Sequence, residues 1–256
     1  QSRQPDLVHS HLFHANVLVA KVLRSDPKIP LIHTAHIIEG RHRPLRPWFE
    51  RRAALRAARV VCVSKAVADH LHSCGWADDK LVIVPNGIDT ARYLDVPEVG
   101  ETADPLVVGI GRLHAQKGFD LLLHAFARIA SAVPQARLHI AGVGAKASSL
   151  AGLASKLGIA DRLTWLGFRS DIPAVMASAR VVAFPSRYEG FGLVLAEAGA
   201  ASRPVVAFDL PTTREIVEDG VTGRIVPLGD VDAFAQALAD VLCDSALASR
   251  QGQAAR

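Results

Sequence analysis

Short β-branched runs alternate with segments of helical periodicity along most of this sequence. The runs predict strands at residues 31–32, 59–63, 81–84, 106–110, 137–141, 163–166, 180–184, 204–208 and 223–226, with strand-like Leu7–Val8 before them. Apolar positions three or four residues apart predict helices at 67–72, 119–132, 148–157, 192–201 and 232–242. Strands that alternate with helices form βαβ units, which favour parallel sheets with ligands at the carboxyl ends of the strands.

One composition break divides the chain. Residues 89–105 are polar and contain Pro97 and Pro105, which is typical of a connection between domains. We therefore predict an α/β protein with a partial N-terminal domain plus this connection at residues 1–100, and a nearly complete domain at 101–256. The chain begins at Gln1 without an initiator Met and ends within a helical pattern, so we expect a fragment of a longer protein.

Composition narrows the class of protein and of ligand. Half of the residues are hydrophobic but few are aromatic, which is typical of layered α/β proteins. A formal charge of +4 suits a polyanionic ligand, and no basic stripe with interleaved aromatics indicates nucleic acid. Cys62, Cys74 and Cys243 have no metal spacing, which favours a reducing, cytoplasmic location. No apolar run approaches the roughly 20 residues that span a bilayer.

The segment around Glu189 carries the strongest chemical signal. A buried strand is followed by Glu189, by Gly190-Phe191-Gly192, and by an apolar helix that contains Glu197. Backbone N–H groups at such a helix start can bind anions, and the glycines let a phosphate approach the main chain. Glu197 lies about 7 Å along the helix at 1.5 Å per residue. The pattern predicts a diphosphate held between two carboxylates that bind hydroxyls, as in a nucleotide-sugar; a solvated helix face or an internal ion pair is the alternative for Glu197.

A second segment adds two cations after the strand at 106–110. Gly111 and Arg112 follow this strand, and Lys117 precedes the next helix. His114 occupies the third glycine position, so the segment is not a dinucleotide fingerprint. Arg112 and Lys117 can reach one anion from a single loop, with Arg binding a phosphate bidentately and Lys as a point charge. The alternative is a pair of solvated surface cations.

Four ordered motifs together carry a family resemblance. They are the E-x7-E pair Glu189 and Glu197, the loop 111–118, Pro85-Asn86-Gly87-Ile88-Asp89 and Val63-Ser64-Lys65. In these motifs the chain resembles the retaining GT-B glycosyltransferases of family 4 over nearly its whole length. The resemblance implies two Rossmann-like domains facing across a cleft, with the nucleotide-sugar on the C-terminal domain and the acceptor on the N-terminal one.

The resemblance also implies roles for particular residues. Catalytic roles fall to His36 near the reacting sugar, to Arg112 and Lys117 on the diphosphate, and to Glu189 on the sugar hydroxyls. Glu197 would bind the ribose, and residues 167–172 would border the base. The implied substrate-binding residues are Gly111, Phe168, Arg169, Ile172, Gly190, Phe191, Gly192, Leu193 and Glu197.

The chain departs from the family pattern in two places. Val143 stands where an acidic residue is common, and the first strand with its glycine-rich loop is absent. The family's retention is usually explained by front-face attack, in which a donor phosphate oxygen takes the acceptor's proton. We therefore expect a hexose-type sugar to move from a UDP- or GDP-sugar to a sugar, lipid-linked or small-molecule acceptor, without metal or cofactor. Asp230 and Asp232 form a DxD sequence that helix capping explains better than metal binding.

Other interpretations stay open at this point. The chain could be a non-catalytic fragment that binds a nucleotide-sugar. His9, His11 and His14 could hold zinc for hydrolysis, although the nearby carboxylate typical of such sites is missing. The alternative is a strand end that enters a helix, with His9 or His11 lining the cleft. The basic segment Arg41–Arg59, which contains Trp48 and Phe49, could be a solvated helix face or could contact an anionic membrane surface during cell-envelope polysaccharide or glycolipid synthesis.

Overall fold

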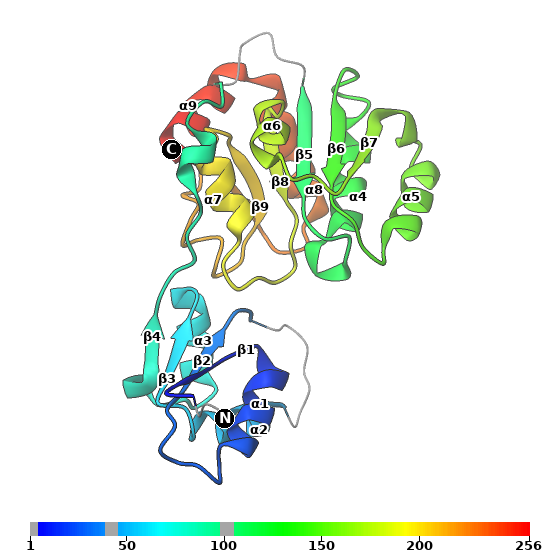
Figure 1. Cartoon of the computed structure of the whole chain (residues 1–256). Coiled ribbons are helices and arrows are strands. Elements are labelled where there is room, and N and C mark those ends of the chain that lie inside the picture. Colours follow the sequence, from blue (N-terminus) through cyan, green and yellow to red (C-terminus); the bar gives the residue numbers. More distant parts are fainter. Residues whose placement is uncertain (1–4, 39–45, 98–104) are drawn as a thin grey trace. The chain divides into compact units, whose positions relative to one another are not determined.

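The computed structural model describes residues 5–38, 46–97 and 105–256 (Figure 1). It divides the chain into two compact units, each with a parallel sheet of its own. The first unit contains residues 1–86 together with the short segment 188–191, and the second contains 87–187 and 192–256. The predicted α/β class with parallel sheets is confirmed.

In the described part of the first unit, four parallel strands lie in the order in which they occur along the chain. They are β1 (Val8–His11), β2 (Leu31–Ala35), β3 (Arg59–Cys62) and β4 (Leu81–Ile83), accompanied by helices α1 (Phe13–Val22), α2 (Arg46–Ala54), α3 (Lys65–Ser73) and the 3₁₀ turn η1 (Asp78–Lys80). Leu31, Val60, Val67 and Trp76 are buried in the core of this unit. Ser64 starts α3 by accepting a hydrogen bond from the N–H of Val67 at 3.1 Å.

The second unit has a sheet whose order reverses partway along the chain. Its described strands are β5 (Leu106–Ile110), β6 (Arg137–Ala141), β7 (Leu163–Gly167), β8 (Val181–Phe184), β9 (Val205–Phe208) and β10 (Gly223–Val226). They lie in the order β10-β9-β8-β5-β6-β7, and all neighbours are parallel. The chain thus builds outward from β5 to β7 and then returns to place β8 on the other side of β5. Ligands of open α/β sheets bind at the carboxyl ends of the strands at such a reversal.

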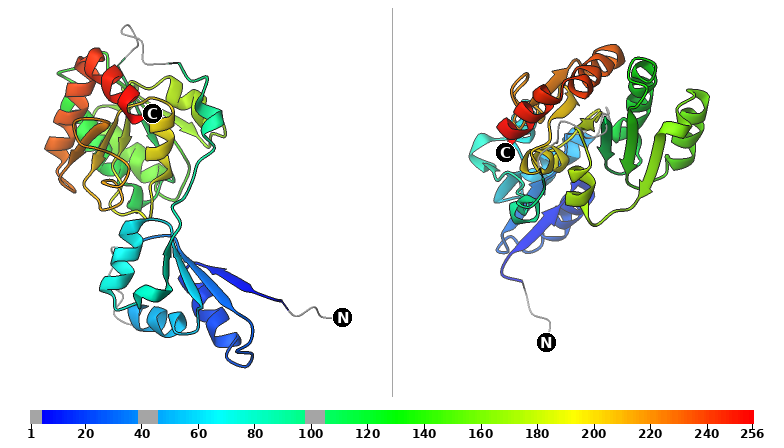
Figure 2. Two further views of the ribbon diagram at one scale, coloured as in Figure 1. Left: turned by 90° about the vertical axis from the view of Figure 1, so that its left-hand side faces the viewer. Right: turned by 90° about the horizontal axis from the view of Figure 1, so that it is seen from above.

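Helices cover both faces of this sheet (Figure 1), and side chains that alternate along the strands pack against them. Val107 and Val181 face helices α4 (Phe119–Ile129), α5 (Ala147–Lys156) and α8 (Val231–Cys243). Val108 and Val182 face α6 (Ile172–Ala177), α7 (Leu193–Ala200) and the 3₁₀ turn η2 (Thr90–Tyr93). The last helix, α9 (Ser245–Ala255), contacts α7, and their red and yellow ribbons lie side by side in Figure 2. Two further 3₁₀ turns are η3 (Ala115–Lys117) and η4 (Ala160–Arg162).

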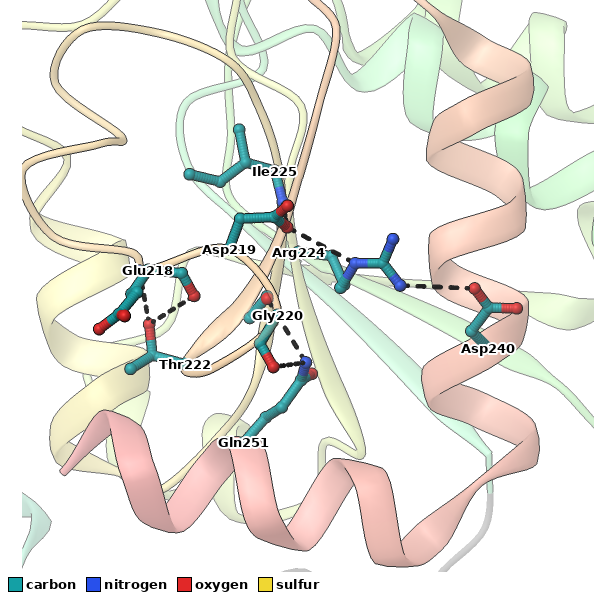
Figure 3. Close-up of polar contacts among 9 residues, drawn as sticks. Glu218, Asp219, Gly220, Thr222, Arg224, Ile225, Asp240 and Gln251 are labelled. Carbon is teal, nitrogen blue, oxygen red and sulfur yellow. Dashed lines mark hydrogen bonds and ion pairs between the residues drawn. The ribbon is translucent and has the colours of Figure 1, made fainter.

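The edge strand β10 is held by side chains from its own loop and from two helices (Figure 3). Asp219 accepts a hydrogen bond from the N–H of Ile225 at 2.8 Å, and Arg224 lies 3.5 Å from Asp219 and 3.6 Å from Asp240 of α8. The buried Gln251 of α9 donates to the carbonyl oxygens of Gly220 and Gly223. These contacts fix the edge of the sheet to the two C-terminal helices.

The predicted strands at 106–110, 137–141 and 223–226 coincide with β5, β6 and β10. Helix α6 was not predicted, because it is one short segment with Pro173 in its first turn. Helix α1, which is apolar on most of its surface, agrees with the strand end entering a helix that was the alternative to a metal cluster. The capping role predicted for Asp230 is confirmed, since its carboxylate accepts from the N–H of Ala233 at 2.9 Å.

The segment predicted as a polar connection is partly built into the second unit. Tyr93 is 1% exposed and Val96 is 8% exposed, and both belong to the core on the α7 face of the sheet. Pro97 is the last described residue before the gap, and Glu98, Gly100, Glu101 and Asp104 lie outside the described residues. Tyr93 and Val96 are three positions apart in an otherwise polar segment, and this spacing indicates that they pack in the core, which the average composition of the segment does not reveal.

Candidate functional site

Two loops meet at the reversal of the sheet in the second unit. One follows β5 and contains Gly111–Gly118, and the other follows β8 from Pro185 onward; β5 and β8 are hydrogen-bonded neighbours. Gly118 has a φ of 63°, and a Cβ there would lie 1.9 Å from the carbonyl oxygen of Pro185. Only glycine fits this approach, so the glycine that ends the predicted cation loop is required by its contact with the second loop.

Lys117 lies where the loops after β5 and β8 meet. Its side chain packs against Gly111, where a Cβ would be 3.4 Å from Lys117 Cδ, and its Nζ lies 5.6 Å from the centre of the Phe184 ring at the end of β8. The ammonium group is therefore held over the carboxyl ends of β5 and β8. Arg112 is exposed, and among the described residues its guanidinium makes no ion pair or hydrogen bond. Both cations lie on the loop where the sequence predicts them.

A bidentate ion pair that the sequence analysis missed joins the two loops. Arg187 donates to both carboxylate oxygens of Asp120 at 2.8 and 2.6 Å and to the carbonyl oxygen of Ala115 at 2.8 Å. The N–H of Arg187 also donates to the carbonyl oxygen of Gln116 at 2.8 Å. Burial alone would raise the pKa of Asp120, but hydrogen bonding and the charge of Arg187 outweigh it and hold that pKa below its usual range. The pair clamps the turn that carries Lys117.

Helix α7 begins with an uncapped first turn, where backbone N–H groups can bind an anion, and it carries Glu197. Gly192 precedes the helix with a φ of 93°, and no side chain caps the first turn. Leu193, the first helical residue, is 45% exposed. Glu197 is half-buried, and burial raises the pKa of its carboxyl, while the neighbouring Tyr93 hydroxyl and the charge of Arg92 act in the opposite direction. The Tyr93 hydroxyl is buried, and within the described residues it has no hydrogen-bond partner of normal geometry.

The loop after β7 lies at the same edge of the sheet. Gly167 has a φ of 65°, Phe168 is 77% exposed, and Arg169 pairs with Asp171 through Nε and Oδ1 at 2.7 Å. Ile172 then begins α6. Arg92 of η2 donates to the carbonyl oxygen of Ser170 at 3.0 Å, so η2 touches this loop as well as α7. An exposed aromatic ring beside a fixed loop is a suitable surface for a planar base.

The segment 188–191 groups with the first unit. Ser64 donates to the carbonyl oxygen of Gly190 at 2.6 Å, and Ile38 N–H donates to that of Glu189 at 3.4 Å. A Cβ at Gly190 would lie 1.8 Å from the carbonyl oxygen of His36, so glycine is required here too. Glu189 is 8% exposed, and Phe191 packs against the core of the first unit. His36 and Glu189–Phe191, predicted from separate motifs, are thus brought together.

A hollow of ≈ 550 Å³ lies on the helix face of the second unit beside the clamp. It is lined by His114, Ala115, Phe119, Asp120, Lys146, Ser149, Leu150, Gly152, Leu153, Lys156 and Arg187. None of Arg112, Lys117 and Glu197 lines it, so the predicted donor residues lie outside this hollow. His114 has a structural task, because its Nδ1 accepts from the N–H of Gln116 at 3.3 Å and caps η3.

The histidines of the first unit form a cluster without the arrangement of a metal site. Within the described ranges, no group of three or more His, Cys, Asp or Glu side chains is placed to hold a metal ion. Burial lowers the pKa of His33 to about 4, and burial followed by the charges of His11 and His9 lowers the pKa of His36. Both shifts favour the neutral form of these rings. None of the described helices has the length and apolarity needed to cross a bilayer.

Two family models match the chain. Residues 96–256 match "Glycosyl transferases group 1" and residues 1–92 match "Glycosyltransferase Family 4". The chain belongs to this glycosyltransferase family. It is 33% identical over 264 residues to the D-inositol 3-phosphate glycosyltransferase of Mycobacterium sp. (strain JLS), covering 93% of this chain and 59% of that protein. It is 29% identical over 194 residues to the lipopolysaccharide core biosynthesis glycosyltransferase LpsE of Rhizobium meliloti (strain 1021), covering 75% of this chain and 56% of that protein.

A solved relative confirms the GT-B fold. Alr3699/HepE of Anabaena, determined in complex with UDP and glucose, superposes with a TM-score of 0.87 at 26% identity over 98% of this chain and 72% of that protein. The predicted family and fold are therefore correct. The chain spans about 59% of the length of the curated relative from strain JLS.

Proposed function

We propose that this glycosyltransferase chain binds a nucleoside diphosphate-sugar and transfers its hexose-type sugar to an acceptor hydroxyl with retention of anomeric configuration. The observation that carries this proposal is the junction of two loops at the reversal of the second unit's sheet. It combines a fixed ammonium at Lys117, an exposed guanidinium at Arg112 and an uncapped helix start at Gly192. All three favour a diphosphate.

The proposed chemistry follows from where charge develops. When the bond between the anomeric carbon and the diphosphate oxygen breaks, negative charge accumulates on that oxygen. Lys117, Arg112 and the N–H groups at the start of α7 stabilise this charge in place of a metal ion. The acceptor oxygen attacks from the face the diphosphate leaves, and a phosphate oxygen takes the acceptor's proton. Glu197 accepts hydrogen bonds from the ribose, and Glu189 and His36 bind hydroxyls of the sugar.

Donor binding and transfer are tested separately. Thermal unfolding of the chain with and without UDP, GDP and their glucose and mannose conjugates tests binding, with EDTA present throughout. Transfer is assayed with the gene product that contains this chain on a panel of sugar and lipid-linked acceptors, and proton NMR of the product gives the anomeric configuration. A nucleotide-dependent rise in the unfolding temperature together with a retained product supports the proposal. Binding without transfer across the panel favours the binding fragment, and transfer that requires a divalent metal overturns metal independence.

Nucleotide-sugar affinity is expected to fall as the pH becomes acid. The fall should begin at a higher pH than the titration of an ordinary glutamate would cause. Burial raises the pKa of Glu197, so its carboxylate is protonated sooner as the pH falls and loses its capacity to accept two ribose hydrogen bonds. We expect a loss of about 10- to 150-fold in UDP-glucose affinity across this titration, since a hydrogen bond to a charged group contributes about 1.5–3 kcal/mol. Calorimetry with UDP-glucose measures it, because a diphosphate diester has no ionisation of its own in this range.

Glu197→Gln is the matched variant for this measurement. It keeps the size of the side chain and cannot titrate, so its affinity at neutral pH is expected to be as low as that of the wild type at acid pH and to stay constant. Glu218→Gln, at an exposed position near β10, serves as the control. A wild-type affinity that does not vary with pH, or a Glu197→Gln variant that varies equally, would refute the role of Glu197.

We also propose peripheral contact between the basic segment and an anionic membrane face, in keeping with cell-envelope synthesis on the cytoplasmic side. Trp48 is 56% exposed and Phe49 43% exposed on α2, and Arg52 lies 5.4 Å from the Trp48 ring. Arg41 and Arg43 lie outside the described residues. Arg56 belongs to the fold, because it donates to the carbonyl oxygens of Leu23, Asp26 and Ile29.

Vesicles test this contact. We expect the chain to sediment with vesicles that contain anionic phospholipid and much less with zwitterionic ones, and we expect salt to reverse binding. Trp48→Ala with Arg52→Ala should reduce sedimentation at least threefold, because a surface lysine or arginine contributes about 1 kcal/mol. Sedimentation that is equal for both lipid compositions would exclude an electrostatic contact.

A further inference from the structure

Two histidines of the first unit share one short hydrogen bond. His11 is the last residue of β1, and His36 directly follows β2, its parallel neighbour. His11 Nδ1 lies 2.8 Å from His36 Nε2, and the two rings are stacked with centres 5.1 Å apart and planes 30° apart. The carboxyl ends of two adjacent strands thus present a histidine dyad.

The chemistry of imidazole makes this bond a constraint on both rings. A neutral imidazole has one N–H and one lone pair, so one of the bonded nitrogens donates and the other accepts. The tautomer of either ring therefore fixes that of the other. Within the described part of the chain, His36 Nδ1 and His11 Nε2 make no hydrogen bond, which leaves one donor or acceptor on each ring for a substrate.

Neighbouring side chains hold His11 in place. The ring centres of His9 and His11 are 4.2 Å apart, and His9 Nε2 lies 2.7 Å from Thr34 Oγ1, which anchors His9 to β2. On the buried side of β1, Ser10 Oγ lies 3.3 Å from His33 Nδ1 and 3.3 Å from Asn16 Oδ1. The end of β1 is therefore tied to β2 on both faces of the strand pair.

The backbone after His11 is strained. Leu12 has a φ of 68° and a ψ of 160°, a backbone conformation that is essentially confined to glycine. The Leu12 side chain is 55% exposed, so burial of this side chain does not account for the conformation. Its N–H reaches the carbonyl oxygen of Thr34 at 3.4 Å. Such strain persists where surrounding contacts over-determine the conformation, and it is concentrated at functional sites. Here it turns the chain from β1 into α1 directly after His11.

We propose that His11 is a positioning residue that holds the ring of His36 in one orientation and one tautomer for the transfer step. This inference rests on the proposed function, in which His36 faces the reacting sugar. His11 then acts through His36, without binding the diphosphate. Losing it affects turnover rather than donor affinity, because a misplaced group near the reacting centre can lower the rate about 100-fold.

Two substitutions at His11 separate the hydrogen bond from bulk. His11→Phe keeps a ring that can stack on His36 but removes Nδ1. His11→Asn places an amide near the position of Nδ1 and can restore the bond. His14→Phe is the matched control, because His14 is an exposed histidine on the same corner and belongs to no hydrogen bond with the dyad. Ring ¹⁵N chemical shifts of His36 report its tautomer in the chain itself, without any activity.

We expect one dominant His36 tautomer in the wild type and in His14→Phe, and averaged shifts in His11→Phe. In the gene product that contains this chain, His11→Phe should lower kcat about 10- to 100-fold with an unchanged donor KM, and His11→Asn should recover part of it. Unchanged His36 shifts in His11→Phe would overturn the inference whether or not the protein transfers sugar. Changed His36 shifts with an undiminished kcat in His11→Phe would also overturn it. If the wild-type protein transfers no sugar, that result counts against the proposed function, and the His36 shifts alone then decide whether His11 fixes the tautomer.

Discussion

Replacing Arg203 by leucine is expected to lower the free energy of unfolding by about 3–5 kcal/mol, the cost of breaking a buried charged network. Arg203 is fully buried in the second unit. Its guanidinium donates to five carbonyl oxygens, those of Met176, Ala177, Ala201, Ser202 and Pro97, at 2.6–3.2 Å. Leucine would leave the buried acceptors of Met176, Ala201 and Ser202 without this donor, and each such group costs about 1–3 kcal/mol.

Chemical denaturation of the chain measures this effect. Arg250→Leu, at an exposed position on α9, is the control and should change stability by less than about 0.5 kcal/mol. Arg203→Lys should recover only part of the loss, since one ammonium has three donors and cannot reach carbonyls spread around a planar fork. A loss below about 1 kcal/mol for Arg203→Leu would show that the carbonyls find other partners.

Arg203 also illustrates what the sequence does not reveal. In Ala201-Ser202-Arg203-Pro204 it is indistinguishable from an arginine in a surface turn, and no periodicity predicts the acceptors, which come from as far away as Pro97. Arg187 is a similar case, because its partner Asp120 lies 67 residues earlier and had the ordinary appearance of an acidic residue at a helix start. Pairings between distant segments depend on the tertiary fold, which local patterns do not encode.

The sheet and the site segments were predictable for the opposite reason. β5, β8 and α7 have short, local signals: buried runs, glycines and a carboxylate inside an apolar helix. The order of the strands was not predicted, and it decides that the loops after β5 and β8 lie side by side. The sequence thus predicted the candidate diphosphate-binding residues, while the strand reversal explains why Lys117 and Gly192, at the start of α7, both lie beside the Phe184 ring. Tyr93 beside Glu197 was missed because it lies in a segment that composition marked as a connection.

Replacing Lys117 by methionine is expected to lower the rate of sugar transfer about 100- to 1,000-fold, the usual effect of removing one donor that stabilises developing negative charge. Methionine keeps an unbranched apolar stem, so the packing against Gly111 and the Phe184 ring is preserved while the ammonium is removed. The ammonium is fixed before any ligand binds, so its loss removes a preorganised charge that water cannot replace at this position.

The decisive comparison is with Lys146→Met. Lys146 lies at the start of α5 on the same side of the unit, is exposed, and makes no side-chain ion pair with any described residue. Both variants lose one positive charge, so a general effect of net charge on an anionic donor would appear equally in both. We expect the transfer rate of Lys146→Met to stay within about threefold of the wild-type rate, whereas that of Lys117→Met falls outside this range. Steady-state assays of the gene product over a range of donor concentrations measure both rates. Equal rates for the two variants would mean that Lys117 contributes only to the general field, and the diphosphate would then have to be held elsewhere than at the junction of the loops after β5 and β8.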